Sequence, residues 1–350
     1  MSDNATLSDI LFPRRARRFR RSTVVISAAV GYDSRDDSRR ACPLRTAPRP
    51  RLGPAGGPFR EYSEAEAPFF AGAALAALDS VAKSDPPWAG VFRRRLALKS
   101  AAAVTGNLLT RREDEAALRD AVALARPAQE LGPAGRVYSA FRTLCRHGDP
   151  FRPARLSAVA ADLQAPLDPG KAAELAAALR ETGGHGRPAP LAAAAAAEAV
   201  IKIRADAGPL ALLCADAALA RALGWPVAAP LLAGELFSRN SSGEGRRPRP
   251  GEAGWTKAVS LATARAALAA LDLAQDLSRR AGRLADAAPK LRAKGKGSAL
   301  EALLADDAVS AAAPIAGLSD RARRRLFERL VALGAARELT GRPTFRLYGL

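Results

Sequence analysis

The chain has 350 residues, of which 48% are hydrophobic and 5% are aromatic, and its formal net charge is +19. This composition can form a sizeable core, but the scarcity of aromatic residues argues against a β-sandwich. The basic excess favours a polyanionic partner, and no uncharged run is long enough for a membrane helix, so we expect no membrane contact.

Residues 1–60 form the first segment. They contain 13 basic residues against 5 acidic ones and are rich in proline, glycine and serine. Such a segment cannot bury enough apolar surface to offset the entropy lost on ordering. We therefore expect a disordered basic arm that is dispensable for folding.

Helical periodicity begins near Ser63 and continues to about residue 240. Ser63 is expected to cap the first helix, with Glu66 as its partner in a capping box. Several later helices begin with proline, which suits the first helical turn. The pattern predicts helices at Trp88–Asn107, Glu113–Arg126, Gly135–His147, Pro169–Thr182, Pro188–Asp206 and Pro209–Leu223. Short turns between them predict an all-α body (61–240), built as a multi-helix bundle or a helical array.

A linker (241–254) separates this body from a long helix and a basic strap, which together span residues 255–297. The helix is predicted at Trp255–Leu284, and the strap follows at Ala288–Gly297. The apolar stripe of the helix consists of Leu261, Ala264, Leu268 and Leu271. The strap has two interpretations that we weigh evenly. It is either a solvated helix end whose charge suits the helix dipole, or a strap that contacts phosphates.

The last segment (298–350) changes character. Short helices are predicted at Ser298–Ala305 and Ala308–Ala316, and Ser319 is expected to cap a third helix, Asp320–Leu333. Two strands, Ala336–Thr340 and Thr344–Tyr348, follow around a turn at Gly341-Arg342-Pro343, with Phe345 and Leu347 half-buried. Three helices and a terminal β-hairpin are the order of a winged helix-turn-helix. Pro314 does not fit this order, because it falls inside the predicted second helix, where proline costs ~3 kcal/mol. We therefore expect the second helix to be short or displaced.

The third helix of this segment has two faces. Its apolar face consists of Ala322, Leu326, Leu330 and Leu333. Helical geometry places Arg321, Arg324 and Glu328 on the opposite face and Arg325 at the flank. Arginine can pair with a phosphate or a guanine edge through two hydrogen bonds. The candidate nucleic-acid-binding residues are Arg321, Arg324, Arg325, Arg342, Arg346, Lys290, Lys294 and Lys296.

Residue types that usually carry chemistry are few and scattered. The cysteines Cys42, Cys145 and Cys214 have neither metal-ligand spacing nor a disulfide pattern, which favours a reducing, cytoplasmic compartment. Neither His147 nor His185 has a partner at zinc-binding spacing. No P-loop, nucleophile elbow or dinucleotide fingerprint occurs. We expect no metal, no cofactor and no enzymatic activity.

Several longer stretches resemble an uncharacterised bacterial family known as domain of unknown function 1403. The stretches are W-A-G-V-F-R-R-R-L-A-L-K-S at Trp88, R-E-D-E-A-A-L-R-D-A at Arg112, G-P-A-G-R-V-Y-S-A-F-R at Gly132, R-P-G-E-A-G-W ending at Trp255, A-P-K-L-R-A-K-G-K-G at Ala288, and E-L-T-G-R-P-T-F-R-L-Y-G-L at the C-terminal end. Together they cover about Trp88 to Leu350 and leave residues 1–60 outside. The last stretch also resembles the winged-helix ends of other bacterial proteins. The family brings no known activity, so no catalytic residue is carried over.

Two functions remain. The first is a DNA-binding accessory or regulatory protein that docks through its winged helix. The second is a helical interaction or scaffold protein whose winged helix packs against protein. A basic surface that is continuous over the third helix, the wing and the strap would favour DNA, whereas one broken by Asp320, Glu328 and Glu338 would favour a protein partner.

Overall fold

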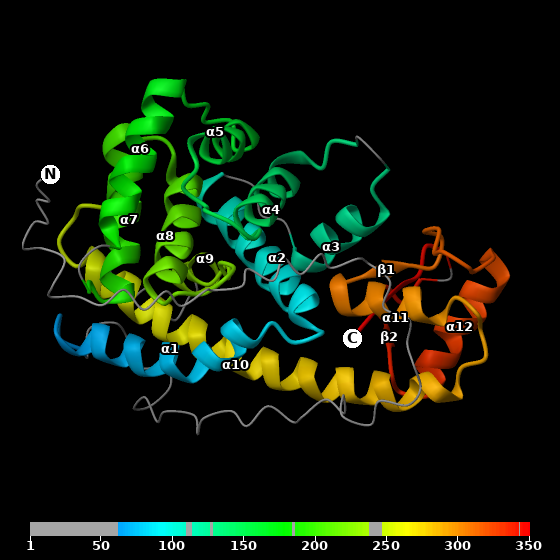
Figure 1. Cartoon of the computed structure of the whole chain (residues 1–350). Helices are drawn as coiled ribbons and strands as arrows, with labels where there is room; N and C mark the ends of the chain where they lie inside the picture. The colour runs from blue at the N-terminus through cyan, green and yellow to red at the C-terminus, as the bar shows by residue number, and fades with distance from the viewer. Residues whose placement is uncertain (1–61, 110–113, 127–128, 184–185, 238–246, 343) are drawn as a thin grey trace, which may run out of the picture. The chain divides into compact units, whose positions relative to one another are not determined.

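The computed structural model describes residues 62–350, apart from residues 110–113, 127–128, 184–185, 238–246 and 343. The predicted arm (1–60) lies outside the described residues, as do His185 and the first part of the linker. Helix predominates in the described residues, which form twelve α-helices, a 3-10 turn and three short strands (Figure 1). The prediction of a helical fold is therefore confirmed at this coarse level.

Nine helices make up the helical body. Their bounds are α1 (Glu66–Ser84), α2 (Ala89–Leu108), α3 (Glu115–Leu124), α4 (Gly132–Leu144), α5 (Pro153–Asp162), α6 (Pro169–Thr182), α7 (Ala189–Ile203), α8 (Gly208–Ala222) and α9 (Leu232–Leu236). The described residues between 62 and 287 contain no strand.

The predicted capping box is present at the start of α1. The Ser63 backbone N–H donates to the Glu66 carboxylate at 2.6 Å, and the Glu66 N–H donates to the Ser63 hydroxyl at 3.2 Å. Two donors that the first helical turn leaves free are thereby satisfied. The predicted bounds of α6 also match the structure, and the Asp168 carboxylate accepts from the Lys171 N–H at 2.8 Å.

Helices α5 and α9 were not predicted. α5 buries only three residues, Leu156, Val159 and Ala160, which is too few for a clear periodic signal. α9 has five residues and depends on a distant side chain, because the Asp216 carboxylate accepts the N–H of Leu232 at 3.1 Å. Nothing in the sequence near α9 indicates that contact.

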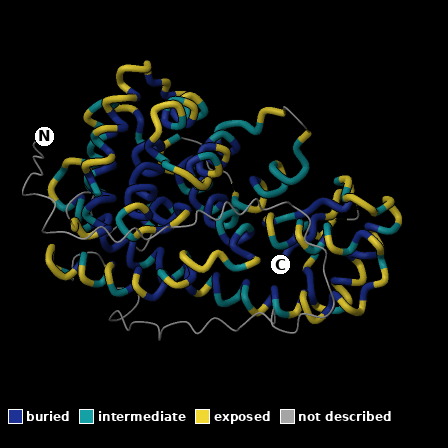
Figure 2. The backbone as a smooth tube through the Cα atoms, in the orientation of Figure 1, coloured by how far each residue is buried: buried dark blue, intermediate teal, exposed yellow. Residues whose placement is uncertain are grey.

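The long helix α10 (Trp255–Ala287) packs along α1 and also touches α7 and α9 (Figure 1). The predicted stripe is buried throughout, and it consists of Leu261, Ala264, Leu268 and Leu271. Alanine dominates the contact between α7 and α8, where small side chains let the backbones approach closely. Figure 2 shows buried residues concentrated in the middle of the helical body and exposed residues on its outer turns.

The chain continues through the 3-10 turn η4 (Ala288–Lys290) into what we call the C-terminal module, Lys296–Leu350. Its elements are α11 (Lys296–Ala305), β1 (Val309–Ser310), α12 (Asp320–Ala332), β2 (Arg337–Glu338) and β3 (Leu347–Gly349). The strands form one antiparallel sheet in the order β1-β3-β2. The module and the helical body belong to one compact unit.

The sheet fixes where α12 lies. Val309 pairs with Tyr348, and Glu338 pairs with the same Tyr348 from the other side. The Tyr348 ring stacks on Phe327 of α12, with ring centroids 4.7 Å apart. Both rings are buried, so this stack forms the centre of the module's own small core.

The predicted second helix, Ala308–Ala316, was wrong. Val309–Ser310 is strand β1, and turns follow it. The reason is Arg323, a buried α12 residue whose guanidinium donates to the carbonyls of Ala311 at 2.5 Å and Ala312 at 3.1 Å. A helix there would turn those carbonyls to its own N–H groups, and Pro314 removes one such donor.

Candidate nucleic-acid interface

Helix α12 presents a basic face. Ser319 caps it, as predicted, by accepting the Ala322 N–H at 3.4 Å. The buried face consists of Arg323, Leu326, Phe327 and Leu330, whereas the predicted face residues Ala322 and Leu333 are only half-buried. The exposed basic side chains are Arg321, Arg324, Arg325 and Arg329. None of these four has an ion-pair partner among the described residues.

Arg329 was missed in the sequence analysis. It lies four residues after Arg325, so one more helical turn of the same pattern would have found it. Glu328 is exposed between these arginines. Asp320 also carries an exposed carboxylate, but Arg323 pairs with it at 2.5 Å. Glu328 is therefore the only acidic side chain of α12 that stays uncompensated.

The lysines of the strap differ in what they contact. The Lys296 ammonium donates to the carbonyls of Ala288 and Leu291, both at 3.0 Å, and so satisfies backbone groups that follow α10. Lys290 and Lys294 are exposed. Lys296 therefore binds the backbone after α10, and Lys290 and Lys294 stay candidate phosphate contacts.

A close backbone contact places the strap next to the start of α12. A Cβ at Gly295 would lie 2.7 Å from the Ala316 carbonyl oxygen and 2.8 Å from Gly317, so only glycine fits there. Lys294 precedes this contact, and Ser319 follows it by two residues. The exposed strap lysines and the N-terminal arginines of α12 are thus brought to one region of the module.

The turn that follows β2 is held together by Glu338. Its carboxylate accepts the N–H groups of Thr340 at 2.9 Å and Gly341 at 2.8 Å, and the Thr340 hydroxyl as well. Because of these hydrogen bonds, which outweigh the effect of burial, the pKa of Glu338 lies below its usual value. Glu338 therefore holds the turn as a carboxylate that accepts three hydrogen bonds.

The two candidate arginines between β2 and β3 have partners within the chain. Arg342 pairs with Asp120 of α3 at 3.2 Å, and Arg346 donates from Nε to the Arg342 carbonyl at 3.3 Å. Phe345 lies between them at φ 56° with 68% of its surface exposed. The prediction that Phe345 is half-buried in a strand was wrong, since β3 begins only at Leu347.

A buried ion cluster fixes the module to the helical body. The Asp307 carboxylate accepts from Arg95 Nε of α2 at 2.6 Å and from Arg119 Nε of α3, and Arg95 also donates to the Leu350 carbonyl at 2.5 Å. Burial would lower the pKa of Arg119, but the charge and hydrogen bond of Asp307 outweigh it and raise that pKa. The sequence analysis missed this cluster, because its members are about two hundred residues apart.

The comparison with protein families covers most of the chain, residues 47–350. The chain belongs to the DUF1403 family. This family is described as proteins of unknown function. The match includes residues 47–60, so the expectation that all of residues 1–60 lie outside the family was wrong. No curated protein and no solved structure matches the chain.

Residues that often carry chemistry are dispersed in the described part of this DUF1403 protein. No group of three or more His, Cys, Asp or Glu side chains that could hold a metal lies there. Burial raises the pKa of the Cys145 thiol above its ordinary value and that of Cys214 to about 12, so neither is activated as a nucleophile. None of the described helices has the length and apolar character to span a membrane.

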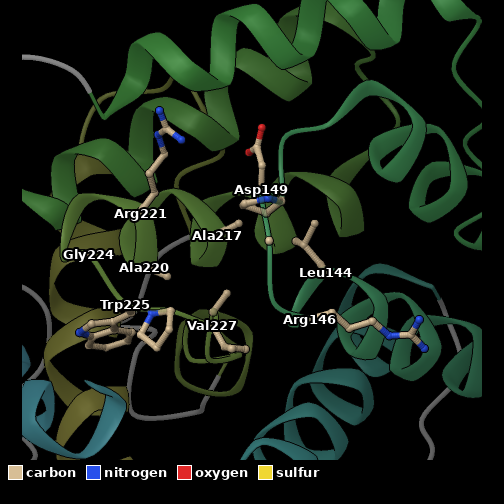
Figure 3. A pocket seen from close by; sticks show the side chains of 13 residues that line it. Leu144, Arg146, Asp149, Ala217, Ala220, Arg221, Gly224, Trp225 and Val227 are labelled. Atoms are coloured by element: carbon tan, nitrogen blue, oxygen red, sulfur yellow. The ribbon is translucent and has the colours of Figure 1, made fainter. Parts of the chain in front are cut away.

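One cavity of about 270 Å³ lies between the end of α4 and the end of α8 (Figure 3). Trp225 and Val227 line it. The charged side chains of Arg146, Asp149 and Arg221 extend away from these two residues. Trp225 itself donates to Asp79 at 2.9 Å. The cavity of this DUF1403 protein is thus lined by apolar side chains on the side of Trp225 and Val227 and by charged residues elsewhere.

Proposed function

We propose that the chain binds double-stranded DNA through its C-terminal module. The observation that carries this proposal is the exposed face of α12, where four arginines without an ion-pair partner among the described residues surround the exposed Glu328. In this arrangement α12 lies against the major groove, and Arg321 and Arg324 contact base edges or phosphates. Lys290 and Lys294 contact the flanking backbone.

The order of elements supports this proposal. One strand precedes α12 and a two-stranded hairpin follows it, which is the order of a winged helix-turn-helix with its middle helix replaced by the turns of residues 311–318. In such modules the helix before the hairpin is the one that enters the groove. Here Arg323 and the ring stack on Tyr348 hold α12 in place instead of a neighbouring helix.

The test is a fluorescence-anisotropy titration of the full chain against a mixed-sequence duplex. The full chain is required because Asp307 ties the module to α2 and α3. Each neutralised phosphate should contribute about 0.9 to the slope of log affinity against log salt. Lys294→Ala should lower that slope by about one, and Arg321→Ala or Arg324→Ala should cost ~1–3 kcal/mol at a preferred site.

Arg152→Ala is the matched control, because Arg152 is an exposed arginine of the helical body at the start of α5. It should leave both affinity and slope unchanged. Binding weaker than ~100 µM at low salt would be weaker than non-specific binding usually is. That result, or an equal loss in the control variant, would contradict the proposal.

A protein partner is the second candidate function, and Phe345 favours it. Its ring is largely exposed on the wing, in a backbone conformation that non-glycine residues rarely adopt. Aromatic side chains are enriched at protein interfaces. The second function replaces the first if two results are found together. The duplex titration shows no binding, and sedimentation shows that the chain forms a protein complex that Phe345→Ser dissociates.

A further inference from the structure

A second basic site lies in the helical body, away from α12. A cavity of about 140 Å³ opens between α2 and α4, with Ala97 and Phe141 as apolar walls. Four arginines and no carboxylate line it. They are Arg93, Arg94, Arg142 and Arg146. The three consecutive arginines of α2 therefore have different surroundings. Arg93 and Arg94 line this cavity, whereas Arg95 binds Asp307.

The positive charge around this cavity is only partly compensated. Arg93 pairs with Asp85 at 2.9 Å and Arg94 pairs with Asp306 at 3.0 Å, but both carboxylates are about half exposed and neither lines the cavity. Exposed pairs of this kind are weak. The guanidiniums of α2 therefore remain able to bind an anion in the cavity.

Arg142 of α4 and Arg146 of the turn after it have no acidic partner in the described part of the chain. The Arg142 guanidinium lies over the Tyr138 ring, 5.7 Å from its centroid. Arg146 extends away from Trp225 and Val227 (Figure 3). Asp149, the nearest acid along the chain, pairs instead with Arg180 at 3.3 Å.

The backbone that carries Arg146 is held in place. Arg155 of α5 donates to three successive carbonyls, those of Arg146 at 3.3 Å, His147 at 3.0 Å and Gly148 at 3.5 Å. The turn after α4 is thereby fixed before any ligand binds, which lowers the entropic cost of binding. Cys145 supplies no negative charge, because burial raises the pKa of its thiol.

We propose that this cavity binds a phosphate group. The ligand is either inorganic phosphate or the phosphate end of a small monoester. The cavity is smaller than the ~300 Å³ at which pockets for whole small molecules begin. A phosphate fits this space, and guanidinium forks match its oxygens with paired hydrogen bonds. This site does not depend on DNA binding by α12.

The test is isothermal titration calorimetry of the full chain with sodium phosphate at constant ionic strength. We expect saturable binding with one phosphate per chain. The double variant Arg142→Gln/Arg146→Gln should weaken it at least ~10-fold, since a hydrogen bond to a charged group contributes about a factor of ten or more. Both residues are exposed, and circular dichroism will confirm that the variant folds.

Two controls separate this site from other basic surfaces. Arg152→Gln in the helical body and Arg321→Gln on α12 should each keep the wild-type affinity. A second arm replaces phosphate by glycerol phosphate. Tighter binding of the monoester identifies the end of a larger ligand, and tighter binding of phosphate identifies the free anion; either result supports the proposal. The proposal would be overturned if the wild type and the double variant bound phosphate with equal affinity. It would also be overturned if titrating sodium chloride gave the same heat signal as titrating sodium phosphate.

Discussion

Asp216 in the helical body and Asp307 in the C-terminal module are both nearly inaccessible to solvent, with 1% and 4% of their surface exposed, yet they are held differently. Asp216 accepts a backbone N–H of α9, and no basic side chain pairs with it in the described part of the chain. Its Oδ2 atom has no hydrogen-bond partner among the described residues. Asp307 lies between two guanidiniums.

The difference shows how the two regions are stabilised. Around Asp216 the body is packed from alanine and leucine, and burial raises the pKa of that carboxyl from 3.8 to about 8, so it is mostly uncharged at neutral pH. The module has a smaller apolar core and is fixed by ionised groups, with Asp307 joining it to α2 and α3 and Arg323 organising its turns.

The largest expected effect follows from removing the charge of Asp307. Asp307→Asn leaves Arg95 without its carboxylate partner and Arg119 with only Glu115, at 3.4 Å. Loss of one partner from a buried ion pair costs about 3–5 kcal/mol. We expect that loss in the free energy of unfolding measured with urea.

The neighbouring residue provides the control. Asp306 pairs with Arg94 but is half exposed, so Asp306→Asn should cost less than ~1 kcal/mol. Equal losses in the two variants would show that the module is not anchored by Asp307.

The second effect is a pH dependence of the helical body. Between about pH 4 and pH 8 the unfolded chain releases the Asp216 proton while the folded chain keeps it, so stability should fall as the pH rises through this interval. The slope is at most ~1.4 kcal/mol per pH unit. Asp216→Asn cannot ionise and should abolish this contribution, so its stability relative to the wild type should rise with pH.

This prediction is checked by urea unfolding of both proteins from pH 4 to pH 9. The informative quantity is the difference between the two curves, because all other groups titrate in both proteins. A difference that stays constant with pH would mean that Asp216 is ionised in the folded state.

The smallest effect compares two glycines inside helices. Gly90 of α2 lies against the backbone of α11, and a Cβ there would be 2.7 Å from Ala305. Gly90→Ala should therefore push the module away and cost ~1–3 kcal/mol. Gly72 of α1 has no atom within 4 Å of its Cβ position, so Gly72→Ala should stabilise the protein by ~0.5–1 kcal/mol.

In thermal unfolding, the melting temperatures of the two variants should thus shift in opposite directions, down for Gly90→Ala and up for Gly72→Ala. A rise in melting temperature in both variants would show that the contact between α2 and α11 can relax. The module would then be less firmly fixed to the body than the structure indicates.

Features that depend on neighbours along the chain could be predicted before the structure was known. The capping box at Ser63, the bounds of α6 and the buried stripe of α10 were all predicted, because a cap and a helical face are set by residues three or four apart. The exposed position of Arg321, Arg324 and Arg325 was predicted for the same reason.

Tertiary structure decided everything that depends on distant partners. Arg323 binds carbonyls of the preceding turns, and this contact replaced a helix by strand β1. Lys296 of the basic strap donates hydrogen bonds to backbone carbonyls, and Arg342 pairs with Asp120 on α3. Local periodicity cannot distinguish an arginine that faces solvent from one that meets a carbonyl or a carboxylate, because the partner is supplied by a segment whose position only the folded chain defines.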